Sequence, residues 1–213
     1  MSPKPIQEQF GEMLIATFAE FARSDIRSVA DLEADEFSHI SSRDHRRNLA
    51  QVFYGARWIY KLGLALLVRD EERAAHVRAQ IVDYASIVEG LLSDCVAHAI
   101  RHGYCVGDRY RYRDPDRRQQ RINWNVQDID AQLGKCSFWW LITIAADFGI
   151  VEGGLVDELQ YLRLDRNDVH LRQHSAVGSS AYLNRSKRAF DLVCRTIAAT
   201  KAWKRAHPPT APV

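Results

Sequence analysis

Apolar residues recur at three- and four-residue steps through most of the chain, a spacing typical of one face of an α-helix. The longest stripe lies within residues 71–102 and ends at Gly103, a residue that commonly terminates helices. The same periodicity predicts further helices over residues 5–23, 43–69, 126–150, 155–173 and 179–204. The sequence therefore predicts an all-α helical bundle with residues 71–102 as its central element.

Two stretches interrupt the helical pattern. Residues 24–40 are acidic and irregular, which favours a short helix or a loop. Residues 103–123 alternate tyrosine and arginine before an Asp-Pro-Asp turn, which favours a short hairpin or an ordered loop. Within the predicted helix 43–69, Gly55 and Gly63 lower helix propensity but would allow a neighbouring helix to approach closely. We therefore expect no sheet of more than two strands.

Composition is that of an ordinary globular protein. A chain of 213 residues is long enough to bury its own core, as one large or two small domains. The first ten residues contain no apolar signal segment, and the longest apolar run, 138–150, is too short to span a membrane. We therefore expect a cytoplasmic protein. The four cysteines form no C-x-x-C pair and suggest a reducing compartment; they are Cys95, Cys105, Cys136 and Cys194.

A basic tract lies between residues 108 and 121. The formal net charge of +2 is too small to mark the whole chain as nucleic-acid-binding, so any such case depends on this local cluster. Arginine and tyrosine together can hold a phosphate backbone and stack on unpaired bases, as single-stranded RNA recognition requires. A solvated loop or a docking site for an acidic partner would have the same composition. The candidate RNA-binding residues are Arg109, Tyr110, Arg111, Tyr112, Arg113, Arg117, Arg118 and Arg121.

A strip of polar side chains adjoins the apolar face of the predicted helix 155–173. Each residue of an α-helix is rotated by ~100° about the helix axis from the one before it. The four members of the strip therefore lie within about 60° of arc around the axis, and Arg166 lies between them and the apolar stripe. Such groups are costly to bury without a ligand or a partner subunit, although a solvated basic edge paired with Asp165 or Asp168 would also fit. The four members are Arg163, Asn167, His170 and His174.

The run LRLDRNDVH resembles the signature helix of the HEPN superfamily in an L-R-x-x-R-N-x-x-H form. The surroundings are also similar: YASIVEGLLSD matches the family's long helix with a central acid, Glu89, and a variable insert and a last amphipathic helix take their usual places. The motif is blended, because Leu164 follows Arg163 where the family has a polar residue. The resemblance implies a HEPN-like bundle over 71–206 with the Arg/Tyr-rich insert, a helical extension over 1–70 packing on it, and a disordered tail over 207–213.

The resemblance implies a metal-independent endoribonuclease that leaves 2′,3′-cyclic phosphate ends and needs no cofactor. His170 would act as general base or acid, Arg163 and Arg166 would stabilise the phosphate, and Asn167 would orient the phosphate or the imidazole. His174 and Glu89 are possible additional site residues. The family also implies a homodimer and a toxin–antitoxin or phage-defence role with an antitoxin or nucleotidyltransferase partner. A catalytically inactive module that binds RNA, a nucleotide or a partner protein is the alternative.

Two further interpretations concern metal binding and assembly. Two H-x-x-x-H pairs have a spacing that can chelate zinc from one helical face, although no H-E-x-x-H motif occurs. The aromatic cluster of Phe138, Trp139 and Trp140 exceeds what one helix face usually buries within a monomer, and we expect it to contribute to the dimer interface. The two pairs are His98 with His102 and His170 with His174.

Overall fold

The chain is almost entirely helical in the computed structural model, which describes residues 11–105, 108–114, 120–124, 129–168 and 179–210. An all-α fold is thereby confirmed. The described residues contain no β-strand, and only the antiparallel bridge between Tyr112 and Arg121 has strand-like pairing. The elements are α2 (Glu12–Arg23), α3 (Val29–Ala34), α4 (Arg43–Ala65), α5 (Asp70–Arg101), the 3₁₀ turn η1 (Asp108–Arg111), α6 (Ile129–Leu133), α7 (Phe138–Asp147), α8 (Gly154–Asp168) and α9 (Ser179–Ala206).

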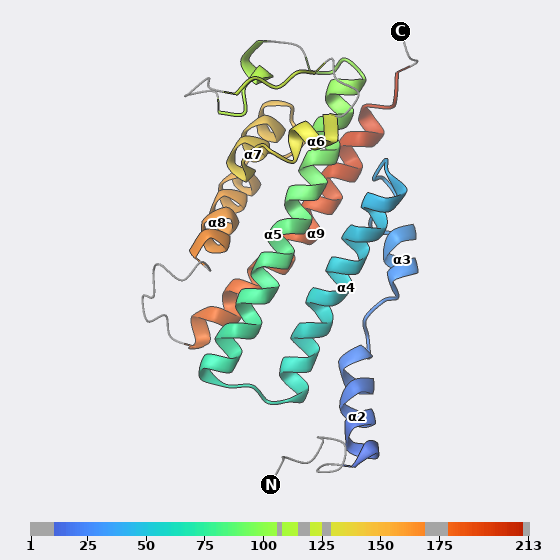
Figure 1. Cartoon of the computed structure of the whole chain (residues 1–213), viewed down its shortest axis with the longest axis vertical. Helices are drawn as coiled ribbons and strands as arrows, with labels where there is room; N and C mark the ends of the chain where they lie inside the picture. Colours follow the sequence, from blue (N-terminus) through green and yellow to red (C-terminus); the bar gives the residue numbers. More distant parts are fainter. Residues whose placement is uncertain (1–10, 106–107, 115–119, 125–128, 169–178, 211–213) are drawn as a thin grey trace.

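Helix α5 is the central element, as its apolar stripe predicts. It contacts α4, α6, α7, α8 and α9, with α4 and α9 running along its length and α7 and α8 stacked beside it (Figure 1). A helix enclosed in this way needs apolar residues around most of its circumference. The stripe residues are accordingly buried, and so are further residues between them; the buried stripe is Val77, Ile81, Tyr84, Val88, Leu92, Cys95 and Ala99.

The helix predicted over 126–150 is wrong, because the structure has two helices, α6 and α7, in its place. Helix α6 ends at Leu133, where the backbone N–H of Gly134 donates to the carbonyl of Asp130 at 2.9 Å. Ser137 then begins α7, because its hydroxyl accepts from the backbone N–H of Trp140 at 3.1 Å. The apolar spacing continues through this break, so only the glycine and the capping serine indicate it.

One hydrophobic core joins the N-terminal segment to the later helices. Phe37, before α4, lies edge-on to Phe53 of α4, with ring centroids 6.0 Å apart. Phe190 of α9 packs on both Phe53 and Tyr84 of α5, at 5.9 Å each. Residues before position 70 therefore pack against the same core as α5 and α9. Among the helices that the structure describes, none is both long enough and apolar enough to cross a membrane.

The residues that follow α9 return to the end of α5. The carbonyl oxygen of His207 lies 2.7 Å from His98 Nε2, and Tyr104 donates from its hydroxyl to the carbonyl of Pro208 at 2.8 Å. The backbone N–H of Thr210 donates to His102 Nδ1 at 3.2 Å. Three of the first four residues of the predicted disordered tail, His207, Pro208 and Thr210, are thus hydrogen-bonded to the bundle, whereas residues 211–213 lie outside the described residues.

We expect alanine to be tolerated at Gly55 but not at Gly90. An added Cβ at Gly90 would lie 2.9 Å from Leu49 Cδ2 and 3.2 Å from the His45 ring, whereas nothing lies within 4 Å at Gly55. Gly55→Ala should therefore raise the free energy of unfolding by ~0.5–1 kcal/mol through helix propensity. Gly90→Ala should be less stable than Gly55→Ala by about 1–3 kcal/mol, measured by urea denaturation. Equal stability of the two variants would contradict close packing of α4 on α5.

Candidate functional site

Helix α8 presents its apolar side to the core, and the described part of its polar strip lies at or near the surface. Leu155, Leu159 and Leu162 are buried, as the periodicity predicts. Along the strip, Arg163 is half-buried and Asn167 is exposed. The other predicted members of the strip, His170 and His174, lie outside the described residues.

Arg166 and Glu89 form an ion pair between α8 and α5. Arg166 Nη1 lies 2.9 Å from Glu89 Oε2, and the guanidinium carbon lies 5.9 Å from the centre of the Phe138 ring. Burial raises the pKa of Glu89, and the charge and hydrogen bond of Arg166 act in the opposite direction. The pair is therefore held in a partly desolvated place where each side chain fixes the position of the other.

Arg163 keeps most of its hydrogen-bonding capacity. Its Nε donates to Gln160 Oε1 at 2.9 Å, and among the described residues no carboxylate pairs with it. Asp165, considered above as a partner for the strip, lies instead 3.8 Å from Arg185 of α9. No described residue thus occupies the Nη groups of Arg163, which could bind an anion. Since Asn167 is four residues further along α8, the two side chains are neighbours on the helix surface.

The Asp165 carboxyl lies between α8 and α9. Burial raises the pKa of Asp165, while Arg185 and Arg188 lower it. Arg188 in turn lies over the ring of Tyr161, 5.1 Å from its centre. These contacts attach α9 to the side of α8 and leave the charges of Arg163 unbalanced by Asp165.

Part of the Arg/Tyr-rich tract is anchored to the bundle. The Tyr110 hydroxyl donates to Asp147 Oδ2 at 3.0 Å, and its ring packs 5.1 Å from that of Phe148. Arg113 donates to Gln120 and Gln132 at 2.8 and 2.6 Å. These two side chains hold the tract against α6 and α7, so any RNA-binding role must fall mainly on the others.

Tyr112 contributes its backbone to the same anchoring. Its carbonyl oxygen accepts from Trp140 Nε1 at 2.7 Å, and it forms the antiparallel bridge with Arg121. The bridge closes a minimal hairpin, one of the two alternatives that the sequence left open for residues 103–123. Of the remaining tract arginines, the side chains of Arg109, Arg117 and Arg118 lie outside what the structure describes.

Arg111 and Arg121 line a pocket of about 310 Å³ together with Asn123 and Trp124. The indole nitrogen of Trp124 is buried, and among the described residues it has no hydrogen-bond partner. An arginine pair beside an aromatic ring with a spare N–H donor suits a phosphate and an unpaired base. Sequence analysis missed Trp124, although a tryptophan between two asparagines, outside any apolar stripe, is a signal that could have found it.

The predicted zinc-chelating pair on α5 is engaged elsewhere. His98 Nε2 and His102 Nδ1 are both hydrogen-bonded to the residues that follow α9, and their rings lie 4.4 Å apart. In the described part of the chain, no three histidine, cysteine or acidic residues are arranged to hold a metal ion. The other pair, His170 and His174, lies outside that part.

The fold and the site define an all-α protein in which a basic helix face is fixed to the central helix through a partly buried ion pair. Comparison of the chain with protein-family models, with curated proteins and with solved structures finds no match. The resemblance to the HEPN superfamily therefore depends on the signature residues and their surroundings quoted above.

Proposed function

We propose that this chain is a metal-independent endoribonuclease of the HEPN type. The observation that supports the proposal is the ion pair of Arg166 with Glu89, at 2.9 Å, which connects the signature helix to the acid of the long central helix. The HEPN resemblance matches these two residues independently, from segments 77 positions apart. A solvated basic helix edge gives no reason for such a desolvated contact.

In the proposed mechanism, His170 takes the proton of a ribose 2′-hydroxyl, and the 2′-oxygen attacks the adjacent phosphorus. The bond from phosphorus to the 5′-oxygen breaks, and the proton that His170 took passes to that oxygen, directly or through water. Arg163 and Asn167 bind the non-bridging phosphate oxygens, where charge develops in the transition state. Glu89 positions Arg166 beside them. The products are a 2′,3′-cyclic phosphate and a 5′-hydroxyl, and neither a metal nor another cofactor takes part.

The test is incubation of the purified chain with structured RNAs in EDTA, followed by analysis of the product ends. Cleavage in EDTA with cyclic phosphate ends would support the proposal. Loss of cleavage in EDTA and its return with zinc would instead favour the paired histidines as a metal site. A wild-type chain that cleaves none of several RNAs would favour the inactive module that binds RNA, a nucleotide or a partner protein.

We further propose that this nuclease acts in a toxin–antitoxin or phage-defence system, restrained by an antitoxin or nucleotidyltransferase partner. The side of α8 that carries Arg163 and Asn167, together with the pocket lined by Arg111 and Arg121, would bind the RNA. Co-expression with the product of each neighbouring gene tests the partner, because a genuine antitoxin would suppress cleavage by the purified complex. A partner that leaves the cleavage rate unchanged would contradict the proposal.

A homodimer through α7 and α8 stays a prediction, but the residues expected at its interface are now different. Phe138 and Trp140 are buried in the core, which removes two of the three aromatic residues expected at the interface. Trp139 is 38% exposed, and Tyr161 and Leu164 of α8 are 57% and 45% exposed. Exposed large apolar residues on neighbouring turns favour an interface. We expect a dimer by light scattering at micromolar concentration, and a shift toward monomer in Leu164→Glu; a wild-type monomer would contradict this.

A further inference from the structure

A second polar pocket lies at the opposite end of the bundle from the start of α9. Its volume is about 270 Å³, and its lining includes Ser41, His98, Lys201, Lys204 and Arg205. The lining comes from the segment before α4, from the end of α5 and from the last turns of α9, which meet there (Figure 1). At ~1.5 Å per residue along α9, this pocket is about 30 Å from the first turn of that helix.

Lys204, which lines the pocket, forms a buried ion pair with Asp94, and the two side chains are 9% and 7% exposed. Lys204 Nζ also donates to the carbonyl of His39 and to the hydroxyl oxygen of Ser41, both at 3.0 Å. All three ammonium protons are therefore used. Since Ser41 Oγ accepts from Lys204, its own proton is free to point elsewhere.

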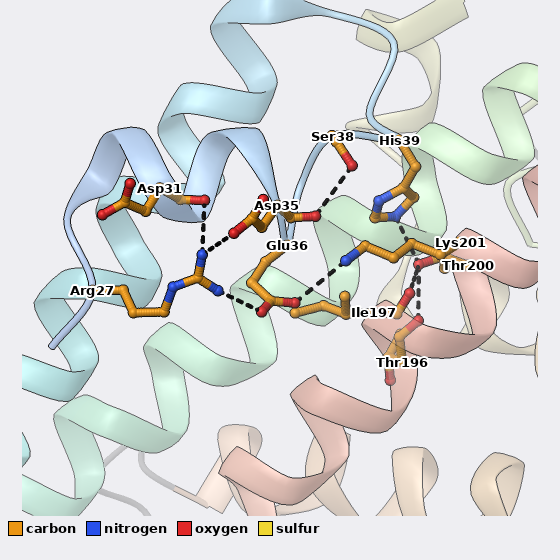
Figure 2. A network of polar contacts seen from close by, with 10 residues as sticks. All are labelled: Arg27, Asp31, Asp35, Glu36, Ser38, His39, Thr196, Ile197, Thr200 and Lys201. Carbon is orange, nitrogen blue, oxygen red and sulfur yellow. Dashed lines mark hydrogen bonds and ion pairs between the residues drawn. The ribbon is translucent and has the colours of Figure 1, made fainter. Parts of the chain in front are cut away.

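The other two cations of the lining are Lys201 and Arg205. Lys201 Nζ lies 3.4 Å from Glu36 Oε2, while Arg27 pairs with Glu36 Oε1 at 3.0 Å and also with Asp35 (Figure 2). Arg205 is exposed, and no carboxylate among the described residues pairs with it. Asp94 offsets the charge of Lys204, and Glu36 and Asp35 together offset those of Lys201 and Arg27. Among the described residues, Arg205 therefore leaves the pocket with an excess of one positive charge.

The His39 imidazole is neutral and lies beside these cations, and one of its two ring nitrogens has no hydrogen-bond partner among the described residues. Its Nε2 lies 2.9 Å from Thr200 Oγ1, and that hydroxyl donates to the carbonyl of Thr196 at 2.8 Å, so it must accept from His39 Nε2–H (Figure 2). Nδ1 is then an unprotonated acceptor, buried without a partner among the described residues. Burial is the main cause that lowers the pKa of His39, to about 4, and the positive charge of Lys204 is the second.

We propose that this pocket binds a phosphate group, as free phosphate or as a small phosphomonoester, through Lys201, Arg205 and the Ser41 hydroxyl. These residues offer several N–H and O–H donors and an uncompensated positive charge, which suit the oxygens of a phosphate dianion. The volume of about 270 Å³ lies just below the roughly 300–1,000 Å³ typical of ligand pockets, which restricts the ligand to a small molecule. The inference does not depend on the proposed nuclease activity.

Binding should be coupled to the protonation of His39. Protonated, its ring can donate to the backbone carbonyl of Glu36, which favours the charged form, and Asp94 favours it too. Burial and the cations Lys204 and Lys201 oppose that form. A bound anion offsets the two cations, so the pKa of His39 should rise toward its ordinary value when phosphate binds.

The first experiment titrates the full chain with inorganic phosphate and with glycerol 3-phosphate by calorimetry at constant ionic strength. We expect saturable binding of one ligand per chain, weakened at least ~10-fold in Lys201→Gln and in Arg205→Gln, the scale of a lost hydrogen bond to a charged group. Lys187→Gln, an exposed lysine on the same helix, should bind as wild type does. Tighter binding of glycerol 3-phosphate would identify a phosphomonoester; equal binding would identify the phosphate group alone.

The second experiment follows the His39 ring by NMR during a pH titration with and without phosphate. An upward shift of its titration midpoint, absent in Arg205→Gln, would support a phosphate inside the pocket. The proposal would be overturned by no saturable binding of either ligand, by equal affinity in wild type and both pocket variants, or by binding that leaves His39 unmoved. Thermal unfolding without phosphate confirms that each variant is folded before it is compared.

Discussion

We expect Arg163→Ala and His170→Ala each to lower the rate of RNA cleavage in EDTA by at least ~10²-fold while leaving the protein folded. A factor of this size is typical for loss of an acid–base group or of a donor that stabilises transition-state charge. Arg163 should be removable without damage to the fold, because it is half-buried and its side chain bonds, among the described residues, only to Gln160 on the same helix. Initial rates on a structured RNA, together with thermal unfolding, measure both effects.

Arg166→Ala is a less informative variant than Arg163→Ala, because it would leave the Glu89 carboxylate partly buried without its cation. Arg188→Ala is the matched control. It removes an arginine that is close to α8, over the Tyr161 ring, but lies outside the polar strip. Cleavage that falls equally in Arg188→Ala and Arg163→Ala would show a general electrostatic effect and contradict a specific role for Arg163.

Variants in the tract separate binding from chemistry. Arg111→Ala combined with Arg121→Ala should weaken RNA binding in a salt-dependent way, because each arginine that contacts phosphate displaces counterions. The rate at saturating RNA should stay close to that of wild type, since neither residue lies on α8. Reduced cleavage at saturation would instead place the tract in the catalytic site.

The spacing of apolar residues was sufficient to predict the all-α class and the central helix. The apolar stripe of α5 is long and continuous, and few positions other than the centre of a helical bundle would bury all of it. The spacing was insufficient for the stretch 126–150, where it persists across a turn set by Gly134 and Ser137. Gly90 was overlooked for a related reason. A glycine inside a helical stripe shows nothing of which neighbouring helix lies against it. Of the two glycines named from the sequence, Gly63 has a close neighbour on α5, since an added Cβ would lie 3.2 Å from His76 Nδ1, whereas Gly55 has none; the closest approach is at Gly90.

Contacts between distant segments limited how much of the site could be predicted. The strip on α8 follows from local geometry, but the pairing of Arg166 with Glu89 was suggested only by the resemblance. Tyr110 and Arg113 looked like exposed RNA ligands, since alternation along a loop does not show which side chains face the protein. The second pocket was not foreseen at all. Lysines near the end of a helix are usually solvated, and only the packing of α9 on α5 brings Lys204 to Asp94.

The largest stability effect should come from that buried pair. We expect Asp94→Ala to lower the free energy of unfolding by about 3–5 kcal/mol, because it leaves the Lys204 ammonium, 9% exposed, without its counter-charge. For a domain of this size the midpoint of thermal unfolding should fall by on the order of 10 °C. Asp94 also accepts from the backbone N–H of Ser41 at 3.2 Å, so the segment before α4 should loosen with it.

The double variant Asp94→Leu with Lys204→Met identifies the cause of this loss. Replacing both charges by apolar side chains removes the unpaired buried ion, so it should recover at least half of the stability lost in Asp94→Ala. Full recovery is not expected, because Lys204 also bonds His39 and Ser41. Glu158→Ala, which breaks the more exposed pair with Arg195, should cost no more than about 1 kcal/mol. If Asp94→Ala costs no more than Glu158→Ala, the ion pair between Asp94 and Lys204 is not desolvated.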